Sequence, residues 1–149
     1  MLYLKIIKMA NCLQIFGNII WIIFGGLFES LIWIFIGILF CITIIGIPFG
    51  KQCFKIAILV ICPFGKDIEY SRKSSCCQLI GNIIWIIFCG LFLAIFNLFV
   101  GCFYCITIIG IPFGLQFFKL ARLSFMPFGA KVIETSDKDI KQIGLTLDK

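Results

Sequence analysis

Two apolar segments, residues 9–65 and 74–130, dominate the pattern of this chain. Charged side chains are rare in both segments, and those present are Glu29, Lys51, Lys55, Lys119 and Arg122. The stretch 30–50 carries no charge at all, and about 20 such residues are enough for an α-helix to cross the hydrocarbon core of a bilayer. The pattern therefore predicts helices embedded in a membrane.

Each apolar segment is too long for one crossing. In the first segment, Gly25-Gly26 and Glu29 mark a break, so we expect a helical hairpin that runs in to about Phe28 and returns to about Gly46. A Gly-Ile-Pro-Phe-Gly motif follows and predicts a tight turn, because glycine allows unusual dihedral angles and proline fits the first turn of a helix. The turn residues of the two segments are Gly46, Pro48, Gly50, Gly110, Pro112 and Gly114.

The two segments are copies of one unit. Aligned without gaps at an offset of 64 residues, 32 of the 52 positions from Gln14 to Gly65 are identical to those from Gln78 to Gly129. Asn, Trp, Thr, Pro and Lys all stay in register, which biased composition alone would not achieve. We assign residues 12–65 to the first unit, 66–75 to a polar linker, 76–130 to the second unit and 131–149 to a polar tail.

The basic residues predict the orientation of the units. Lysine and arginine flank the apolar runs, and the positive-inside rule places such flanks in the cytoplasm. Both termini and the linker are then cytoplasmic in a multi-pass protein of a bacterial inner membrane or a plasma membrane, and the two units are parallel. If the short basic helices crossed the membrane, the units would instead be inverted.

Composition narrows the class of protein. The chain is 62% hydrophobic and 13% charged, whereas soluble domains are about 45–50% apolar and about 25% charged. We predict an all-α membrane protein with two tandem repeats, each a transmembrane helical hairpin plus an amphipathic interfacial helix. The net charge of +6 fits membrane topology and headgroup contact better than nucleic-acid binding, for which no motif is present.

Several polar residues inside or beside the apolar runs are candidate site residues. Asn18 and Asn82 would join helices of the repeats or of two subunits by hydrogen bonds, or line a pore. Thr43 and Thr107 would bond to their own helix backbone. Glu29 is expected to be exposed at the hairpin tip, with a proton relay as the alternative. Four basic residues would reach lipid headgroups: Lys51, Lys55, Lys119 and Arg122.

Catalytic and metal chemistry find little support in the sequence. The chain has nine cysteines but no histidine and no CxxC pair, so zinc-ligand spacing is lacking. No paired acids, nucleophile elbow or phosphate-binding loop occurs either. We expect no enzymatic activity, no metal and no cofactor. Most of the cysteines should be buried small residues, although Cys76-Cys77 beside the second unit could carry a lipid.

The repeated motifs resemble those of the YccF family, the inner membrane component domain. They are Gly-Asn-x-x-Trp, a Gly-Ile-Pro-x-Gly turn and a closing Pro-x-Gly, and here they begin at Gly17, Gly46, Pro63, Gly81, Gly110 and Pro127. The resemblance implies a small multi-pass membrane protein without an established activity. We expect a non-enzymatic structural or assembly component that contacts lipids and self-associates. The alternatives are a channel or transporter component and an anionic-lipid-binding membrane protein.

Overall fold

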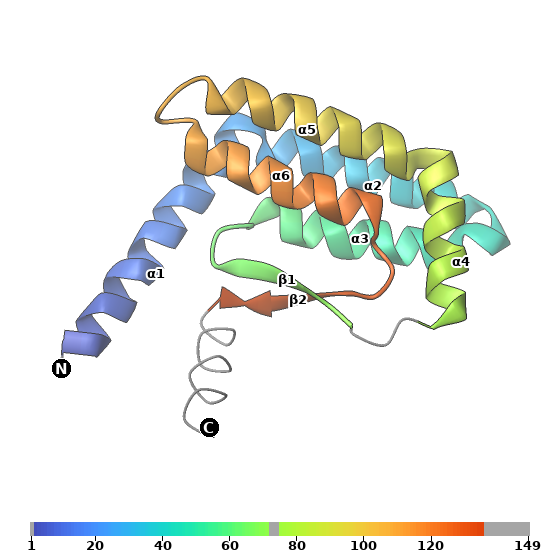
Figure 1. Ribbon diagram of the computed structural model, residues 1–149, viewed down its shortest axis with the longest axis horizontal. Coiled ribbons are helices and arrows are strands. Elements are labelled where there is room, and N and C mark those ends of the chain that lie inside the picture. The colour runs from blue at the N-terminus through green and yellow to red at the C-terminus, as the bar shows by residue number, and fades with distance from the viewer. Residues whose placement is uncertain (1, 72–74, 136–149) are drawn as a thin grey trace.

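The computed structural model describes residues 2–71 and 75–135, with side chains from residue 8 onward. Arg72, Lys73 and residues 136–149 of the predicted tail lie outside these ranges. The chain is mostly helical (Figure 1). Its elements are α1 (Leu2–Trp21), η1 (Ile22–Gly26), α2 (Leu27–Ile42), η2 (Ile44–Gly46), α3 (Ile47–Ile61), β1 (Lys66–Tyr70), α4 (Cys76–Trp85), η3 (Ile86–Gly90), α5 (Leu91–Cys105), α6 (Ile111–Phe125) and β2 (Ala130–Glu134).

Each repeat begins with a bent helix, and the second half of that helix forms a hairpin with the next helix. In the first repeat α1 passes through the π-helical turn η1 into α2, and Gly25 leaves the helical conformation there. The chain then reverses at residues 43–46, and α3 packs along α2. Both repeats therefore contain a helical hairpin and one further helix. The predicted reversal near Phe28 is wrong, because the Gly25-Gly26 break bends the helix without ending it.

The repeated glycines explain the tight turn and the close packing of the hairpin. A Cβ atom at Gly46 would overlap the carbonyl oxygen of Phe40, so no larger residue fits the turn. A Cβ atom at Gly50 would lie 2.8 Å from the carbonyl oxygen of Gly37, so α2 and α3 touch backbone to backbone there. Pro48 occupies the first turn of α3, where its missing N–H leaves no hydrogen bond unmade.

A two-stranded antiparallel sheet joins the repeats, and the all-α prediction omitted it. Strand β1 lies within the predicted linker, and β2 begins at Ala130, the last residue of the predicted second unit, and continues into the predicted tail. Ile68 pairs with Val132, which is its equivalent at the 64-residue offset, and Lys66 pairs with Glu134 at the end of the ladder. A pseudo-two-fold axis therefore passes through the centre of the sheet and relates the two repeats.

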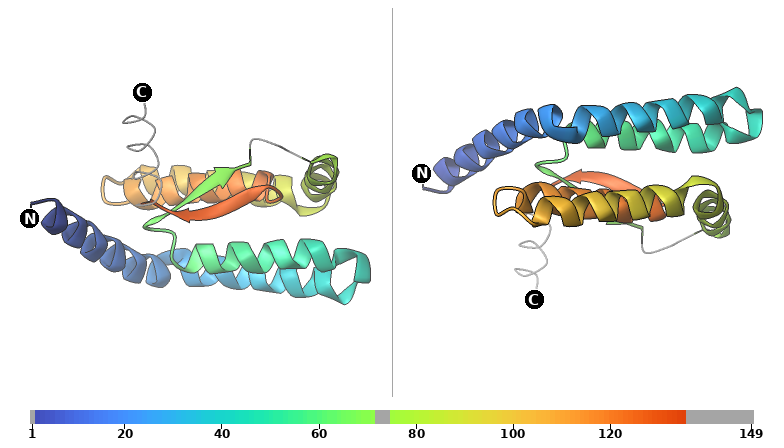
Figure 2. Two further views of the ribbon diagram at one scale, coloured as in Figure 1. Left: turned by 90° about the horizontal axis from the view of Figure 1, so that it is seen from below. Right: turned by 90° about the horizontal axis from the view of Figure 1, so that it is seen from above.

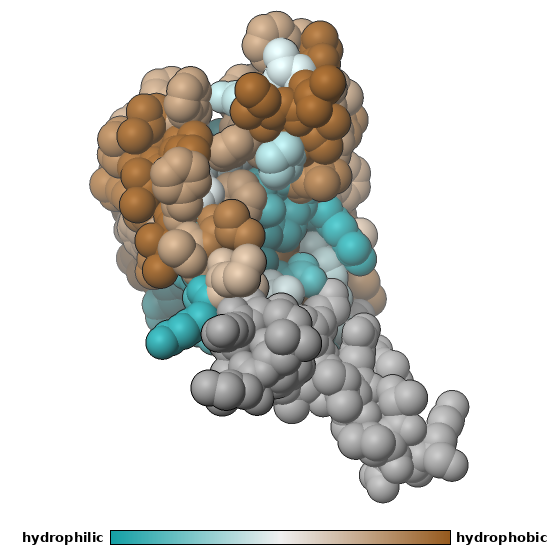
Figure 3. Space-filling model, turned by 90° about the vertical axis from the view of Figure 1, so that its left-hand side faces the viewer, coloured by the Kyte–Doolittle hydropathy of each residue, from teal (hydrophilic) through white to brown (hydrophobic). Residues whose placement is uncertain are grey.

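The two hairpins form two layers with the sheet on one side of them. The closed ends of α2–α3 and α5–α6 point in opposite directions across the molecule (Figures 1 and 2). The strands, and the end of α1 from which the chain starts, lie below the hairpins in Figure 1. In the space-filling view, apolar residues cover the upper part of the molecule and polar residues gather below (Figure 3).

Within the described part of the chain, three helical segments are long and apolar enough to cross a membrane: Lys8–Ile42, Ile44–Ile61 and Cys76–Cys105. Less than two fifths of the most apolar window of each is buried inside the molecule, so most of this apolar surface faces outward. The interior is filled mainly where the repeats meet, around the fully enclosed rings of Trp21, Trp33 and Trp85.

Candidate functional site at the junction of the repeats

Two equivalent lysines join the repeats at the junction, which is the contact between the two repeats. Each lysine donates hydrogen bonds to the backbone of the other repeat. Lys119 of α6 donates hydrogen bonds to the carbonyl oxygens of Pro63 (2.9 Å) and Lys66 (2.7 Å). Lys55 of α3 donates one to the carbonyl oxygen of Ala130. Helix α6 therefore binds the segment that follows α3, and α3 binds the segment that follows α6. Both lysines were expected to extend to lipid headgroups, but their ammonium groups bind backbone carbonyl oxygens of the other repeat, from an exposed side chain at Lys55 and a half-buried one at Lys119.

Burial sets the electrostatics of Lys119, which lies outside the candidate membrane segments. Removal from water lowers the pKa of Lys119 to about 8, and the nearby Asp67 carboxylate opposes part of this shift. Charge-assisted bonds to two carbonyl oxygens keep the ammonium satisfied. On the surface beside it, the Arg122 guanidinium lies 5.0 Å from the ring centre of Tyr70, a cation–π contact. Burial also raises the pKa of Tyr70.

Asn18 and Asn82 fix the loop that closes each repeat. The Asn18 side chain donates to the carbonyl oxygen of Phe64 (3.1 Å) and accepts from the Phe64 amide (3.0 Å). Asn82 makes the same two bonds to Phe128. The expected partners were other helices or a pore, but each amide instead binds the backbone of its own Pro-Phe-Gly loop. The following residue, Gly65 or Gly129, has a positive φ near 90° that only glycine adopts freely.

Thr43 and Thr107 serve the hairpin turns. Their hydroxyl groups donate to the carbonyl oxygens of Phe40 (2.9 Å) and Tyr104 (3.2 Å), three residues earlier in each case. The Thr107 oxygen also accepts from the amide of Gly110 (3.1 Å). Both threonines therefore act within their own turns.

The tryptophans of the Gly-Asn-x-x-Trp motifs connect the two repeats. Trp21 donates its indole N–H to the carbonyl oxygen of Val60 (2.7 Å), and Trp85 donates to that of Ser124 (2.7 Å). Each bond ties the tryptophan to the third helix of its own repeat. Their rings, however, pack against aromatic residues of the other repeat: Phe113 and Phe117 for Trp21, and Trp33, Phe40 and Phe49 for Trp85.

A buried polar cluster occupies the same interface. Glu29 is 3% exposed and accepts a hydrogen bond from the Trp33 indole (3.2 Å), and Asn97 of α5 lies beside its carboxyl group. Asn97 is fully buried and donates to the Leu93 carbonyl oxygen (2.9 Å), while its own side-chain oxygen has no hydrogen-bond partner in the described structure. The prediction that Glu29 is exposed at a tip is wrong, because the helix continues past it and turns this face toward the second repeat.

A basic pocket opens between α3 and the sheet. Its volume is about 640 Å³, and its lining combines four lysines with apolar side chains. The lining residues are Lys51, Phe54, Lys55, Ile58, Leu59, Lys66, Lys131 and Val132. Of the four residues predicted to reach headgroups, Lys51 and Lys55 lie here, whereas Lys119 and Arg122 belong to the other half of the molecule.

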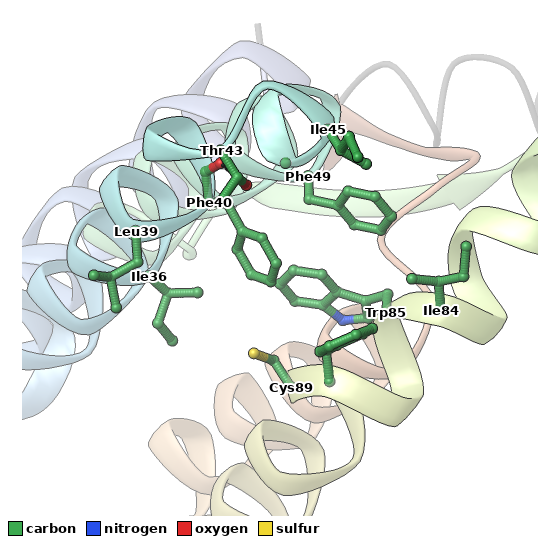
Figure 4. A pocket seen from close by; sticks show the side chains of 11 residues that line it. Ile36, Leu39, Phe40, Thr43, Ile45, Phe49, Ile84, Trp85 and Cys89 are labelled. Carbon is green, nitrogen blue, oxygen red and sulfur yellow. Dashed lines mark hydrogen bonds between the residues drawn. The ribbon is translucent and has the colours of Figure 1, made fainter.

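A second, apolar pocket of about 430 Å³ lies between the first hairpin and the α4–η3 bend. The rings of Phe40, Phe49 and Trp85 face one another there, with Cys89 below them (Figure 4). At the equivalent place in the other half, Tyr104 stands in the position of Phe40 and donates its hydroxyl to the Phe24 carbonyl oxygen (2.9 Å).

Comparison with known proteins decides the family. The model of the YccF family, described as the inner membrane component domain, matches residues 16–66 and again residues 80–130. The chain belongs to the YccF family. It is 30% identical over 125 residues to the inner membrane protein YccF of Escherichia coli K12 and to that of Shigella flexneri, covering 78% of this chain and 84% of each relative. No solved structure gives a significant match.

The family membership accounts for the repeated residues of the junction. Asn18, Trp21, Lys55 and their equivalents lie within the two matched units. The lysines and the tryptophan rings contact the other repeat, whereas the two asparagines bind the loop of their own repeat. The sequence alone did not predict that Glu29, Trp33, Asn97 and Ser124 form one cluster. The sequence did carry a signal, because these are positions at which the two repeats differ. At the 64-residue offset Glu29 corresponds to Leu93, Trp33 to Asn97 and Ser124 to Val60.

Proposed function

We propose that this YccF protein is a non-enzymatic structural component of its membrane that is embedded from one side. In this arrangement both hairpins run along the membrane plane, with their closed ends and apolar faces in the hydrocarbon and the basic side chains of α3 and α6 on the side of the sheet. The sheet lies at the membrane surface, and the pseudo-two-fold axis runs along the membrane normal. The two repeats are then parallel, and the start of α1 and both strands share one side of the membrane.

The exposed isoleucines of the hairpin turns carry this proposal. Ile44, Ile45, Ile108 and Ile109 are 84–87% exposed, at the closed ends of the two hairpins. A turn in water is normally polar, and each isoleucine left in water forgoes about 1.5–3 kcal/mol of burial free energy. Both closed ends therefore belong in lipid.

Hairpins that crossed the membrane would place the charged sheet inside the hydrocarbon. Because the closed ends point in opposite directions, crossing would put them at opposite membrane faces, with the sheet at mid-depth (Figures 1 and 2). The sheet carries charged side chains at Lys66, Asp67, Glu69, Lys131 and Glu134. Placing one charged side chain at the bilayer centre costs about 2.5–3.5 kcal/mol or more. Embedding from one side avoids that cost and keeps all four isoleucines in lipid.

Side-specific labelling tests the proposed embedding. Single cysteines at residue 45 or 109, in a variant without the native cysteines, are treated with a membrane-impermeant maleimide in sealed oriented vesicles. A cysteine replacing Lys131 on the sheet serves as the reference. We expect labelling of residue 131 from one side only, and none of residues 45 and 109 from either side. Labelling of either turn by the impermeant reagent would contradict the proposal.

A channel or transporter component is the second candidate, and the buried Glu29 favours it. An intramembrane carboxyl group at a repeat interface is a common feature of ion and proton pathways. The test is proton flux in liposomes containing the purified protein and a pH-sensitive dye. Flux that disappears in Glu29→Gln supports this role, and absence of flux in the wild-type protein removes it.

A further inference from the structure

The basic pocket brings together positive side chains from three separate elements. Lys51 and Lys55 come from α3, Lys66 from β1 and Lys131 from β2. The Lys55 ammonium is already engaged with the Ala130 carbonyl oxygen. Across the ladder, Glu134 stands opposite Lys66 and Glu69 opposite Lys131, but neither glutamate lines the pocket. Among the residues that the structure describes, no carboxylate lines the pocket, so its concave surface presents positive charge.

The other half of the molecule lacks this concentration of charge. At the 64-residue offset, Lys51 corresponds to Leu115, Lys66 to Ala130 and Lys131 to Asp67. Three lysines in one half are thus replaced by two uncharged residues and an acid in the other. In the other direction, Arg122 stands where the pocket has Ile58. The equivalent surface of the other half therefore keeps Lys119 and Arg122 beside Asp67, and its positive charge is smaller than that of the basic pocket.

Apolar side chains complete the pocket and indicate the kind of ligand. Ile58 is 67% exposed, and Phe54 and Val132 flank it in the lining. A free phosphate would make no use of these side chains. A phospholipid would, because its headgroup phosphate fits ammonium groups while its glycerol backbone and first methylenes contact Phe54 and Ile58.

We propose that the basic pocket binds one anionic phospholipid, with the headgroup phosphate held by Lys51, Lys66 and Lys131 and the acyl chains along Phe54 and Ile58. This inference rests on the one-sided embedding proposed above, which sets the pocket at the level of the headgroups.

The test compares matched variants that each lose two positive charges. Lys51→Gln/Lys131→Gln removes two exposed lysines of the pocket, and Lys8→Gln/Arg122→Gln removes two exposed charges elsewhere. Each protein is reconstituted in nanodiscs of phosphatidylcholine with increasing phosphatidylglycerol, and bound phosphatidylglycerol is counted by native mass spectrometry. At about 1 kcal/mol for each lysine near anionic lipid, the pocket variant should lose about 20- to 30-fold in affinity. The control should change less than threefold.

Three results would overturn the proposal. They are a wild-type protein with no preference for phosphatidylglycerol, a control variant that loses as much as the pocket variant, and displacement of the lipid by millimolar inorganic phosphate. The last would identify a free anion as the ligand. The labelling experiment on residues 45 and 109 is run on the same variants, so a failed lipid site in an embedded protein is distinguishable from failed embedding.

Discussion

Ile68 and Val132 face each other at the centre of the antiparallel ladder, and each is the equivalent of the other in the two repeats. Two residues that pair with each other on a pseudo-two-fold axis must be equivalent residues of the two repeats. The same symmetry produces the paired lysine bonds of Lys55 and Lys119 and the crossed packing of Trp21 and Trp85. The two repeats therefore form one body, and substitutions at equivalent positions can serve as controls for each other.

Removal of either asparagine side chain should loosen the corresponding loop. Asn82→Ala deletes two hydrogen bonds to the Phe128 backbone, and Asn18→Ala deletes the same two bonds to Phe64. A buried backbone group left unpaired costs about 1–3 kcal/mol. We expect each variant to lose free energy of unfolding in that range, measured by denaturant titration in detergent. Asparagines that served only a pore would leave stability unchanged.

The turn glycine should tolerate no side chain. Gly46→Ala places a methyl group against the Phe40 carbonyl oxygen, whereas a Cβ atom at Gly17 would lie at ordinary contact distance, 3.4 Å, from the Phe64 ring. We expect Gly46→Ala to reduce the free energy of unfolding by about 1–3 kcal/mol, the cost of overpacking, and Gly17→Ala to change it by less than about half as much. Equal effects from both substitutions would contradict the turn geometry.

Glu29 should accept glutamine but not leucine. The glutamine side chain in Glu29→Gln would retain an oxygen for the Trp33 indole N–H, while Glu29→Leu leaves that buried donor without a partner. An unsatisfied buried donor costs about 1–3 kcal/mol. We therefore expect Glu29→Leu to be less stable than Glu29→Gln by about that amount in thermal unfolding monitored by circular dichroism. A leucine variant as stable as the glutamine variant would place Glu29 in contact with water.

Lys119 should make stability depend on pH. Its pKa in the folded protein is lowered to about 8 from an ordinary value of about 10.5. Between these two values the unfolded chain binds more protons than the folded one, so the contribution of Lys119 to the free energy of unfolding rises as pH increases. We expect the free energy of unfolding of the wild-type protein to increase relative to that of Lys119→Met between pH 8 and pH 10. The Lys119 side-chain resonance should titrate near pH 8, and a midpoint above pH 10 would contradict the burial.

The membrane class could be predicted because it follows from local composition. The tandem repeat could be predicted because identical residues recur at a fixed 64-residue offset. The hairpin position could not, because Gly25-Gly26 looks the same in sequence whether the chain bends or reverses. The sheet left a short signal that charge obscured: polar and apolar residues alternate from Asp67 to Tyr70, as in a strand. Its charges led the sequence analysis to treat the segment as a linker.

The contacts of the candidate site were beyond sequence reasoning for a different reason. Asn18 and Phe64 are 46 residues apart, and Lys119 and Pro63 are 56 apart, so no local pattern connects them. Glu29 meets Asn97 only because the pseudo-two-fold axis brings α2 against α5. The basic residues were correctly noticed, but sequence alone could not separate the lysines that fasten the junction from those that line the pocket.

The depth of the two hairpin turns tests the central claim most directly. Spin labels at residues 45 and 109 of the cysteine-free protein are compared in bilayers for their collision rates with oxygen and with a water-soluble nickel complex. One-sided embedding predicts that both labels lie in the hydrocarbon at the same depth, with high oxygen and low nickel accessibility. Labels accessible to nickel at either turn, or two turns at different depths, would contradict a pseudo-two-fold axis along the membrane normal.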